Sequence, residues 1–272
     1  MSEYAEYALL SEYYDRFTDD VPYERWADFF EHIFAEKQQK PQIILDLACG
    51  TGSVTRILAQ RGYDMIGADQ SEDMLMIAME SCCDLQGEHR PVFLHQSMQE
   101  LDLYGTIDAC VCCLDSINYV TDPEVLREAF RRIQLFMMPG GLFIFDINTR
   151  AKLQRIDGQT FVREDEDVFC CWQATVDEND LCHYDFDIFE INEDGAWNRY
   201  QEHHAERIYD VEFLKRLLEE TGFEDIEIHG ELSDDAPQAG EERIFLIARA
   251  NNQEKKDDQI RLVTEEMRTN HE

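Results

Sequence analysis

The sequence predicts an α/β protein with a doubly wound, mostly parallel β-sheet that carries helices on both faces. Three observations predict it. Short apolar runs alternate with helical segments from residue 41 to about residue 150. A glycine-broken loop containing Gly50 and Gly52 joins the first apolar run to its helix. Residues 155–206 leave this rhythm and alternate apolar with polar residues, which indicates a small antiparallel insertion.

Residues 1–40 are expected to form an N-terminal helical cap. Large apolar side chains recur near helical spacing in two stretches, and Val21 and Pro22 separate the two. The residues concerned are Tyr4, Tyr7, Ala8, Tyr14 and Phe17, then Trp26, Phe29, Phe30, Ile33 and Phe34.

Residues 41–154 and 207–250 are expected to form the main domain. Five runs predict strands: IILDLA, MIGAD, VFLHQ, IDACVCCL and GLFIFDI. Helical patterns fill residues 53–61, 71–83 and 122–137, with Pro123 at a helix start and PGG at 139–141 between helix and strand. A last helical pattern ends at Gly222, and DIEIHGE and RIFLIARA follow as closing strands.

Residues 155–206 are expected to be an antiparallel insertion that serves as a substrate lid. Three segments alternate at period two, FVREDEDVFCCWQATV, CHYDFDIFEI and WNRYQEHHAERIY, and turn-like DEND and NEDG separate them. We expect one strand from each. Residues 251–272 are polar and charged, and we expect a loose or helical tail.

Composition limits the partners. The formal charge is −35, from 59 acidic and 24 basic residues, so direct nucleic-acid binding is disfavoured. No apolar stretch is long enough to cross a membrane and the first residues lack a signal-peptide layout, so we expect a cytoplasmic protein without a membrane partner. The nine cysteines read as reduced, and Cys110 and Cys113, although spaced as CxxC, lie in an apolar run, so no metal site is predicted.

The glycine loop is compatible with either of two classes of ligand. A dinucleotide loop requires a third small residue where Thr55 stands, which weakens a nicotinamide oxidoreductase. Alternatively, Asp46 accepts hydrogen bonds around a cationic ligand, and the small residues after it let the backbone approach an amino-acid and sugar moiety. Asp69 ends the next strand at the offset where a carboxylate binds ribose hydroxyls, so it indicates a nucleoside.

Five motifs carry a family resemblance. DLACGTG, GADQSEDML, HQSMQEL, LDSINYV and PGGLFIFDINT resemble class I S-adenosylmethionine-dependent methyltransferases in order and spacing, over residues 4 to about 249. YYDRFTDDVPYERW and EHHAERIY are similar to a bacterial branch of small-molecule or uncharacterised methyltransferases with a β-rich insertion. The resemblance implies a Rossmann-like fold and S-adenosylmethionine as cofactor.

The resemblance also implies a cofactor site. The methionine moiety would lie against Ala48, Gly50 and Gly52, with Asp46 near its ammonium group. Asp69 would hold the ribose.

For the adenine, the resemblance implies contacts from the segments after the second and third strands. Gln70 and Met74 would flank the ring. Ser97 stands where relatives commonly carry aspartate, so adenine binding would rest more on Met98 and stacking.

The candidates for chemistry lie elsewhere. Leu114 and Asp115, ending the fourth strand, would face the sulfonium and its methyl group. Asp115, Tyr119, Tyr14 and His204 are the candidate catalytic side chains, and Tyr14 is also a candidate cofactor or substrate contact. No metal is needed for in-line methyl displacement.

We therefore expect a methyltransferase acting on a small-molecule oxygen or nitrogen. The insertion holds 15 acidic and three basic residues, which indicates either a solvated face or attraction of a cationic acceptor. Three alternatives stay open: methylation of a protein or of RNA presented by a partner, a cofactor-binding regulatory protein without turnover, and the nicotinamide enzyme. The oligomeric state, monomer or homodimer, is open as well.

Overall fold

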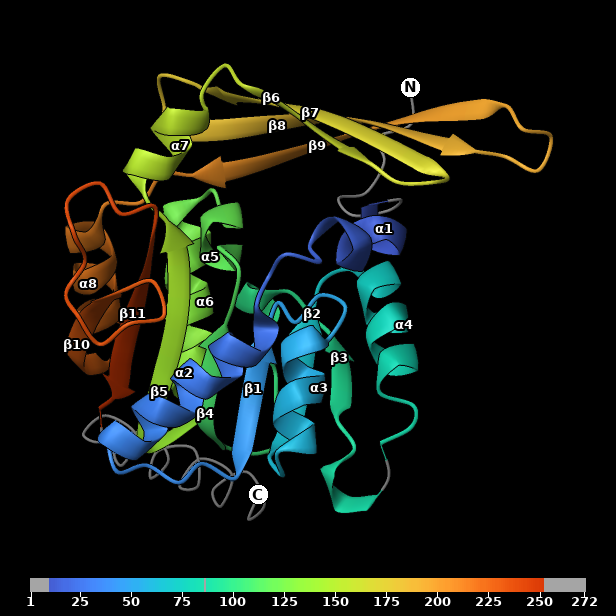
Figure 1. Ribbon diagram of the computed structural model, residues 1–272. Helices are drawn as coiled ribbons and strands as arrows, with labels where there is room; N and C mark the ends of the chain where they lie inside the picture. Colours follow the sequence, from blue (N-terminus) through green and yellow to red (C-terminus); the bar gives the residue numbers. More distant parts are fainter. Residues whose placement is uncertain (1–9, 86, 252–272) are drawn as a thin grey trace, which may run out of the picture.

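The protein has two layers: a body built around a mostly parallel sheet, and an antiparallel sheet that lies across one edge of that body (Figure 1). The structure is a computed structural model that describes residues 10–85 and 87–251. The predicted helical positions of Tyr4, Tyr7 and Ala8, and nearly all of the predicted tail, lie outside the described residues. No helix among the described residues combines the length and apolar character needed to span a membrane.

The body contains a seven-stranded sheet in the order β10-β11-β5-β4-β1-β2-β3. The first five strands in the chain are parallel, β11 runs antiparallel to β5, and β10 runs antiparallel to β11. This order confirms the predicted doubly wound sheet. The strands are β1 (Ile43–Leu47), β2 (Asp64–Asp69), β3 (Val92–His95), β4 (Ile107–Cys112), β5 (Met137–Asn148), β10 (Phe223–Gly230) and β11 (Arg243–Ala250).

The order of the strands fixes where a ligand can bind. β1 is central, with β2 on one side and β4 on the other, so the chain reverses its direction of sheet growth next to β1. In such sheets the loops after the neighbouring strands separate at the carboxyl edge and leave a crevice. The segments after β1, β2 and β4 therefore meet at one place.

Helices cover both faces of the sheet. Apolar side chains of α2 (Tyr23–Glu36) and α3 (Ser53–Gln60) form one core with Ile44, Ile144 and Phe245. On the other face α6 (Pro123–Phe136) and α8 (Val211–Glu220) pack on Leu45, Phe143 and other buried residues. The remaining helices are α1 (Leu10–Phe17), α4 (Glu72–Ser81), α5 (Ser116–Tyr119), α7 (Arg150–Ile156) and the 3₁₀ turns Gly87–His89 and Met98–Glu100.

The predicted N-terminal cap divides into two parts with different positions. Trp26, Phe30 and Ile33 of α2 are buried in the body, so α2 belongs to the layer that covers the sheet. Only α1 lies at the carboxyl edge, between the body and the antiparallel sheet (Figure 1).

The antiparallel sheet has four strands, so the prediction of three is wrong. They are β6 (Thr160–Glu164), β7 (Val168–Val176), β8 (Leu181–Ile191) and β9 (Trp197–Arg207), paired in that order. The segment expected as one strand from Phe161 to Val176 is a hairpin, closed by a hydrogen bond from Asp165 N to Val168 O of 2.9 Å. The charged run 165–167 forms its turn, whereas the sequence pattern predicts that this run lies within one long strand.

A second difference concerns residues 139–141, which are predicted to lie between a helix and the following strand. β5 starts at Met137 and continues through Pro139, Gly140 and Gly141. The register to β4 shifts there, because Ile107 pairs with Met137 and Ala109 pairs with Leu142. Gly140 takes a φ of 82°, and a Cβ on Gly141 would lie 2.6 Å from Asp108 O. The glycines therefore form a bulge within the strand.

Candidate active site

A cavity of about 810 Å³ opens at the carboxyl edge of the parallel sheet. Residues that follow β1, β2, β3 and β4 line it, together with one residue of α1. A second cavity of about 50 Å³ shares part of this wall and extends to the end of β1. Ten predicted site residues line the larger cavity: Tyr14, Ala48, Gly50, Asp69, Gln70, Met74, Ser97, Met98, Leu114 and Tyr119.

Asp69 joins the two loops that the sequence singled out. Gly50 N donates to its Oδ2 at 2.8 Å, and Ser71 N donates to its Oδ1 at 2.8 Å. Burial raises the pKa of Asp69, and these backbone donors act against that rise. A carboxylate has about four acceptor sites, so both oxygens can still accept ligand hydroxyls.

Gly50 supplies an open backbone position beside that carboxylate. Its φ is 54°, and a Cβ added there would meet no atom within 4 Å. The residue lines both cavities, so a ligand can approach its main chain closely.

Gly52 has a different place from the one expected. It lines neither cavity. It precedes α3 with a φ of 78°, and a Cβ there would lie 3.0 Å from the Cβ of Ala78 in α4. Its smallness therefore serves the contact between α3 and α4.

Asp46 lies in the wall of the small cavity and is bound to Thr55. Thr55 Oγ1 donates to Asp46 Oδ2 at 2.6 Å, and both side chains are buried. Burial raises the pKa of Asp46 to about 7, which the hydrogen bond from Thr55 opposes. The threonine that breaks the dinucleotide pattern thus satisfies a buried carboxyl group.

The segment after β3 forms the opposite wall. Ser97 Oγ donates to Glu100 Oε2 at 2.7 Å, so its hydroxyl is engaged within its own turn. His95 also lines the cavity, and its Nε2 lies 2.8 Å from Gln70 O. Sequence reasoning missed His95, although its position at the end of the VFLHQ run was a usable signal.

Asp115 lines neither cavity, contrary to its expected position facing the ligand. Its Oδ1 accepts from Arg243 Nη2 at 2.6 Å, and its backbone N donates to Asp146 Oδ2 at 2.9 Å. Arg243 also pairs with Asp146. Asp115 therefore belongs to a partly buried ion-pair network behind the wall, and neither Arg243 nor Asp146 was identified from sequence.

His204 is also behind the wall. It is fully buried on β9, and its Nε2 lies 3.1 Å from Glu202 Oε2. Its ring centroid is 6.1 Å from that of Tyr119, in an edge-to-face arrangement. Tyr119 therefore stands between His204 and the cavity.

Tyr14 reaches both cavities from α1. Burial raises its pKa, and the neighbouring Tyr23 and Asp115 raise it further. The Tyr14 hydroxyl thus stays protonated at neutral pH and can orient a ligand, but it is a poor base.

Hydrogen bonds hold α1 against both layers. Thr51 Oγ1, in the glycine loop, donates to Asp15 Oδ1 at 2.6 Å. On the other side Arg16 Nη2 lies 2.6 Å from carboxylate oxygens of both Asp165 and Asp167, in the turn between β6 and β7. Tyr14 is thereby held between the glycine loop and the antiparallel sheet.

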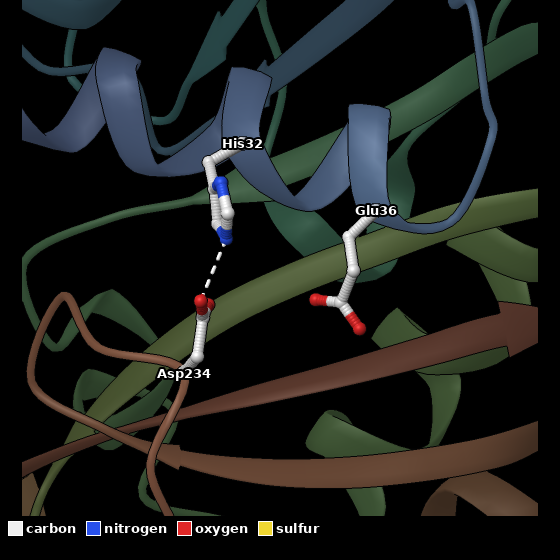
Figure 2. Close-up of side chains that lie close together, drawn as sticks. All are labelled: His32, Glu36 and Asp234. Carbon is white, nitrogen blue, oxygen red and sulfur yellow. Dashed lines mark hydrogen bonds and ion pairs between the residues drawn. The ribbon is translucent and has the colours of Figure 1, made fainter.

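One group among the described residues has the spacing of metal ligands: His32, Glu36 and Asp234. His32 and Glu36 project from α2 toward the loop that carries Asp234, and His32 Nε2 lies 2.7 Å from Asp234 Oδ2 (Figure 2). All three are exposed, and none lines the larger cavity. The group is an exposed surface cluster separate from the candidate site.

Comparisons with known proteins agree with this geometry. A family profile described as a methyltransferase domain matches residues 14–228. YqeM of Bacillus subtilis, provisionally named as a methyltransferase, is 33% identical over 89% of this chain and 96% of its own length.

Solved structures give the same result. An S-adenosylmethionine-dependent methyltransferase from Clostridium acetobutylicum is 28% identical, with a TM-score of 0.79 over 88% of this chain and 96% of that one. The sugar N-methyltransferase KedS8 from Streptoalloteichus shares the fold at 20% identity, with a TM-score of 0.74 over 93% of this chain and 98% of that one. The chain belongs to the class I S-adenosylmethionine-dependent methyltransferases and is an enzyme that uses S-adenosylmethionine as its methyl donor.

Proposed function

We propose that the enzyme methylates an oxygen or nitrogen atom of a small molecule by in-line displacement. The observation that carries this proposal is the large cavity at the carboxyl edge, with α1 and the antiparallel sheet lying over that edge (Figure 1). A volume of about 810 Å³ suits the cofactor together with a small acceptor. The fold shared with the sugar N-methyltransferase KedS8 supports an acceptor of this size.

The residues present fit the cofactor. Asp69 offers free acceptor sites for ribose hydroxyls, and the Gly50 backbone leaves open space beside it. Gln70, Met74 and Met98 line the part of the cavity assigned to the adenine. When bound, S-adenosylmethionine supplies a methyl group on a positively charged sulfur.

The chain's own task is then alignment in a dry site. We call the part of the cavity formed by Tyr14, Leu114, Ser116 and Tyr119 the acceptor end. Tyr14 and Tyr119 exclude water there, and their hydroxyls orient the acceptor. The two tyrosines thus position the acceptor. Asp115 and His204, both behind the wall, support them.

The test is a metabolite extract incubated with the enzyme and isotopically labelled S-adenosylmethionine. We expect one small metabolite to gain the label, and Asp69→Ala to abolish that gain. Label found only in protein or RNA would contradict a small-molecule acceptor. Tight cofactor binding without label in any fraction would indicate a regulatory protein instead.

We also place the enzyme in the cytoplasm. Its nine cysteines are free thiols, which suits a reducing compartment.

A further inference from the structure

Three carboxyl groups lie together behind the acceptor end, and we call them the acidic cluster: Asp115, Asp146 and Glu206. Each comes from a different element, the start of α5, the end of β5 and the end of β9. Asp146 and Glu206 are 0% and 3% exposed. Burying several carboxyl groups together is unfavourable unless something compensates their charge.

The cluster adjoins the cavity. Asp115 stands between Leu114 and Ser116, which both line it. The charge of Asp115 acts on Tyr14 in the cavity wall and on Glu206. None of the three carboxyl groups lines the two cavities, and the cluster adjoins the acceptor end through the chain neighbours of Asp115.

The compensating charge within the cluster is incomplete. Arg243 binds Asp115 and Asp146 and is a single cation for two carboxyl groups. Asp146 Oδ1 is buried and has no hydrogen-bond partner among the described residues. The end of the cluster at Glu206 has no ion pair with a lysine or arginine among the ion pairs of the described chain.

Glu206 is held in place by neutral groups. Its Oε2 accepts from Asn148 Nδ2 at 2.9 Å, and the Tyr184 hydroxyl donates to it. Lys152 is nearby, but its Nζ donates to Asn148 Oδ1 at 2.7 Å. Burial, and then Asp115, raise the pKa of Glu206 to about 8.

The other titratable groups facing this region come from the elements packed around it. Tyr14 reaches it from α1 and Tyr184 from β8, and burial raises the pKa of both phenols. On β9 itself, Glu202 and His204 are bound to each other at 3.1 Å. The positive charge that acts on Glu206 is that of Lys152, whose ammonium group is already bound to the side chain of Asn148.

We propose that the acceptor is an amine, and that the acidic cluster, through Glu206, determines this specificity. The inference rests on the proposed function. In methyl transfer the positive charge moves from sulfur to the acceptor atom. A neutral amine forms the new N–CH₃ bond with its lone pair while the S–CH₃ bond breaks and its electron pair returns to sulfur. The nitrogen thereby becomes cationic beside the carboxyl groups, which stabilise it. An oxygen acceptor would have to be an anion or lose a proton beside the same groups, which is unfavourable.

Sinefungin and S-adenosylhomocysteine test the charge preference directly. They share the adenosine and amino-acid parts, but sinefungin carries an ammonium group where the sulfonium methyl would lie. The contacts that both ligands make with the cofactor site therefore contribute equally to the two affinities and drop out of their ratio. Calorimetry in buffers of different ionisation enthalpy measures both the ratio and the protons released on binding.

We expect the wild-type enzyme at pH 7 to bind sinefungin about tenfold more tightly than S-adenosylhomocysteine. Close to one proton should be released with sinefungin only, as Glu206 ionises beside the ammonium group. In Glu206→Gln, which keeps one acceptor oxygen for Asn148 and removes the ionisable group, the ratio should fall to about one and the proton release should vanish. Glu164→Gln, on the exposed edge of the same sheet, is the control and should behave as wild type.

The outcomes separate the two proposals. Equal ratios and equal proton release in wild type and Glu206→Gln, with both nucleosides bound, would overturn the amine specificity and leave the methyltransferase proposal standing. Failure of both nucleosides to bind would overturn the proposed function itself. Labelled product from the metabolite extract adds an independent result, because a methyl group on nitrogen supports the inference and a methyl group on oxygen contradicts it.

Discussion

Asp69 is the residue on which the cofactor site depends most. Each of its carboxylate oxygens accepts one backbone N–H, from Gly50 after β1 and from Ser71 at the start of α4. The side chain therefore fixes the distance between the two loops and still presents lone pairs to a ribose. A smaller, neutral side chain at position 69 would lose both the bonds to the two loops and the acceptors for the ribose.

Asp69→Ala should weaken binding of S-adenosylhomocysteine by about 100-fold, because charged hydrogen bonds to the ligand and to Gly50 are both lost. Titration calorimetry measures this. Asp64→Ala, at the exposed opposite end of β2, is the control and should bind normally. Equal affinity of the two variants would remove Asp69 from the site.

At this scale the sequence predicted the position of Asp69 and Gly50 in the cavity wall, because each of them follows from the end of a strand. Their contacts with the cofactor stay predictions. Sequence reasoning failed for Asp115, because the partner that binds its carboxylate, Arg243, lies 128 residues further along the chain. Glu206 was missed for the same reason, since only the packing of β9 against α5 brings it near Asp115.

At the scale of elements, the contact between α3 and α4 depends on Gly52. Gly52 and Gly195 have almost the same φ, 78° and 77°, but only Gly52 has a neighbour, Ala78, within reach of a Cβ. Alanine at either position should lower the unfolding free energy by about 1–2 kcal/mol, because an alanine is strained in the left-handed backbone conformation.

Gly52→Ala should therefore lower the unfolding free energy by about 1 kcal/mol more than Gly195→Ala does, because the new Cβ is crowded against α4. Urea unfolding of the two variants gives the difference. Equal losses would show that α4 moves aside without cost.

Helix α1 links the glycine loop to the antiparallel sheet. Arg16→Ala removes its two ion pairs to the turn between β6 and β7. Hydrogen exchange in residues 10–17 should then accelerate about fivefold, as expected for loss of about 1 kcal/mol. Arg199→Ala breaks a comparable exposed pair with Asp187 outside α1 and should leave this exchange unchanged. Identical exchange in both variants would contradict the linking role.

Elements were predicted well where their periodicity was undisturbed, as in α6, α8 and the five parallel strands. The β6–β7 hairpin was missed because its turn, residues 165–167, is charged and lacks glycine, proline or asparagine. Such a run fits the polar positions of a long strand equally well. What decides between the two is tertiary, since Arg16 of α1 binds two carboxylates in the turn.

At the scale of the whole molecule, buried carboxyl groups couple stability to pH. Burial raises the pKa of Asp46 to about 7, of Asp146 to about 6 and of Glu206 to about 8. In the unfolded chain these groups ionise near pH 4. The folded protein therefore binds more protons between about pH 4 and pH 8, so its stability must fall as pH rises through that range.

Urea unfolding at pH 5.5 and pH 8 should show this fall, and Glu206→Gln should reduce it by up to about 1.4 kcal/mol per pH unit. Glu164→Gln, which removes an exposed carboxylate, controls for the change in net charge. A slope unchanged in Glu206→Gln would mean that Glu206 is ionised in the folded protein at pH 5.5.

The fold class and the position of the cavity followed from sequence, because alternating strands and helices place strand ends at one edge. The set of side chains that forms the acceptor end could not be predicted from sequence. This end is formed by α1, Leu114 and α5, and β9 and β11 supply the side chains behind it, so its composition depends on tertiary contacts that no local pattern encodes.

A crystal structure with S-adenosylhomocysteine tests the central claim most directly. The account predicts the ligand in the cavity at the carboxyl edge, with its ribose hydroxyls hydrogen-bonded to Asp69 and its amino-acid part beside Gly50. A ligand bound at another place, or one whose ribose makes no contact with Asp69, would contradict it.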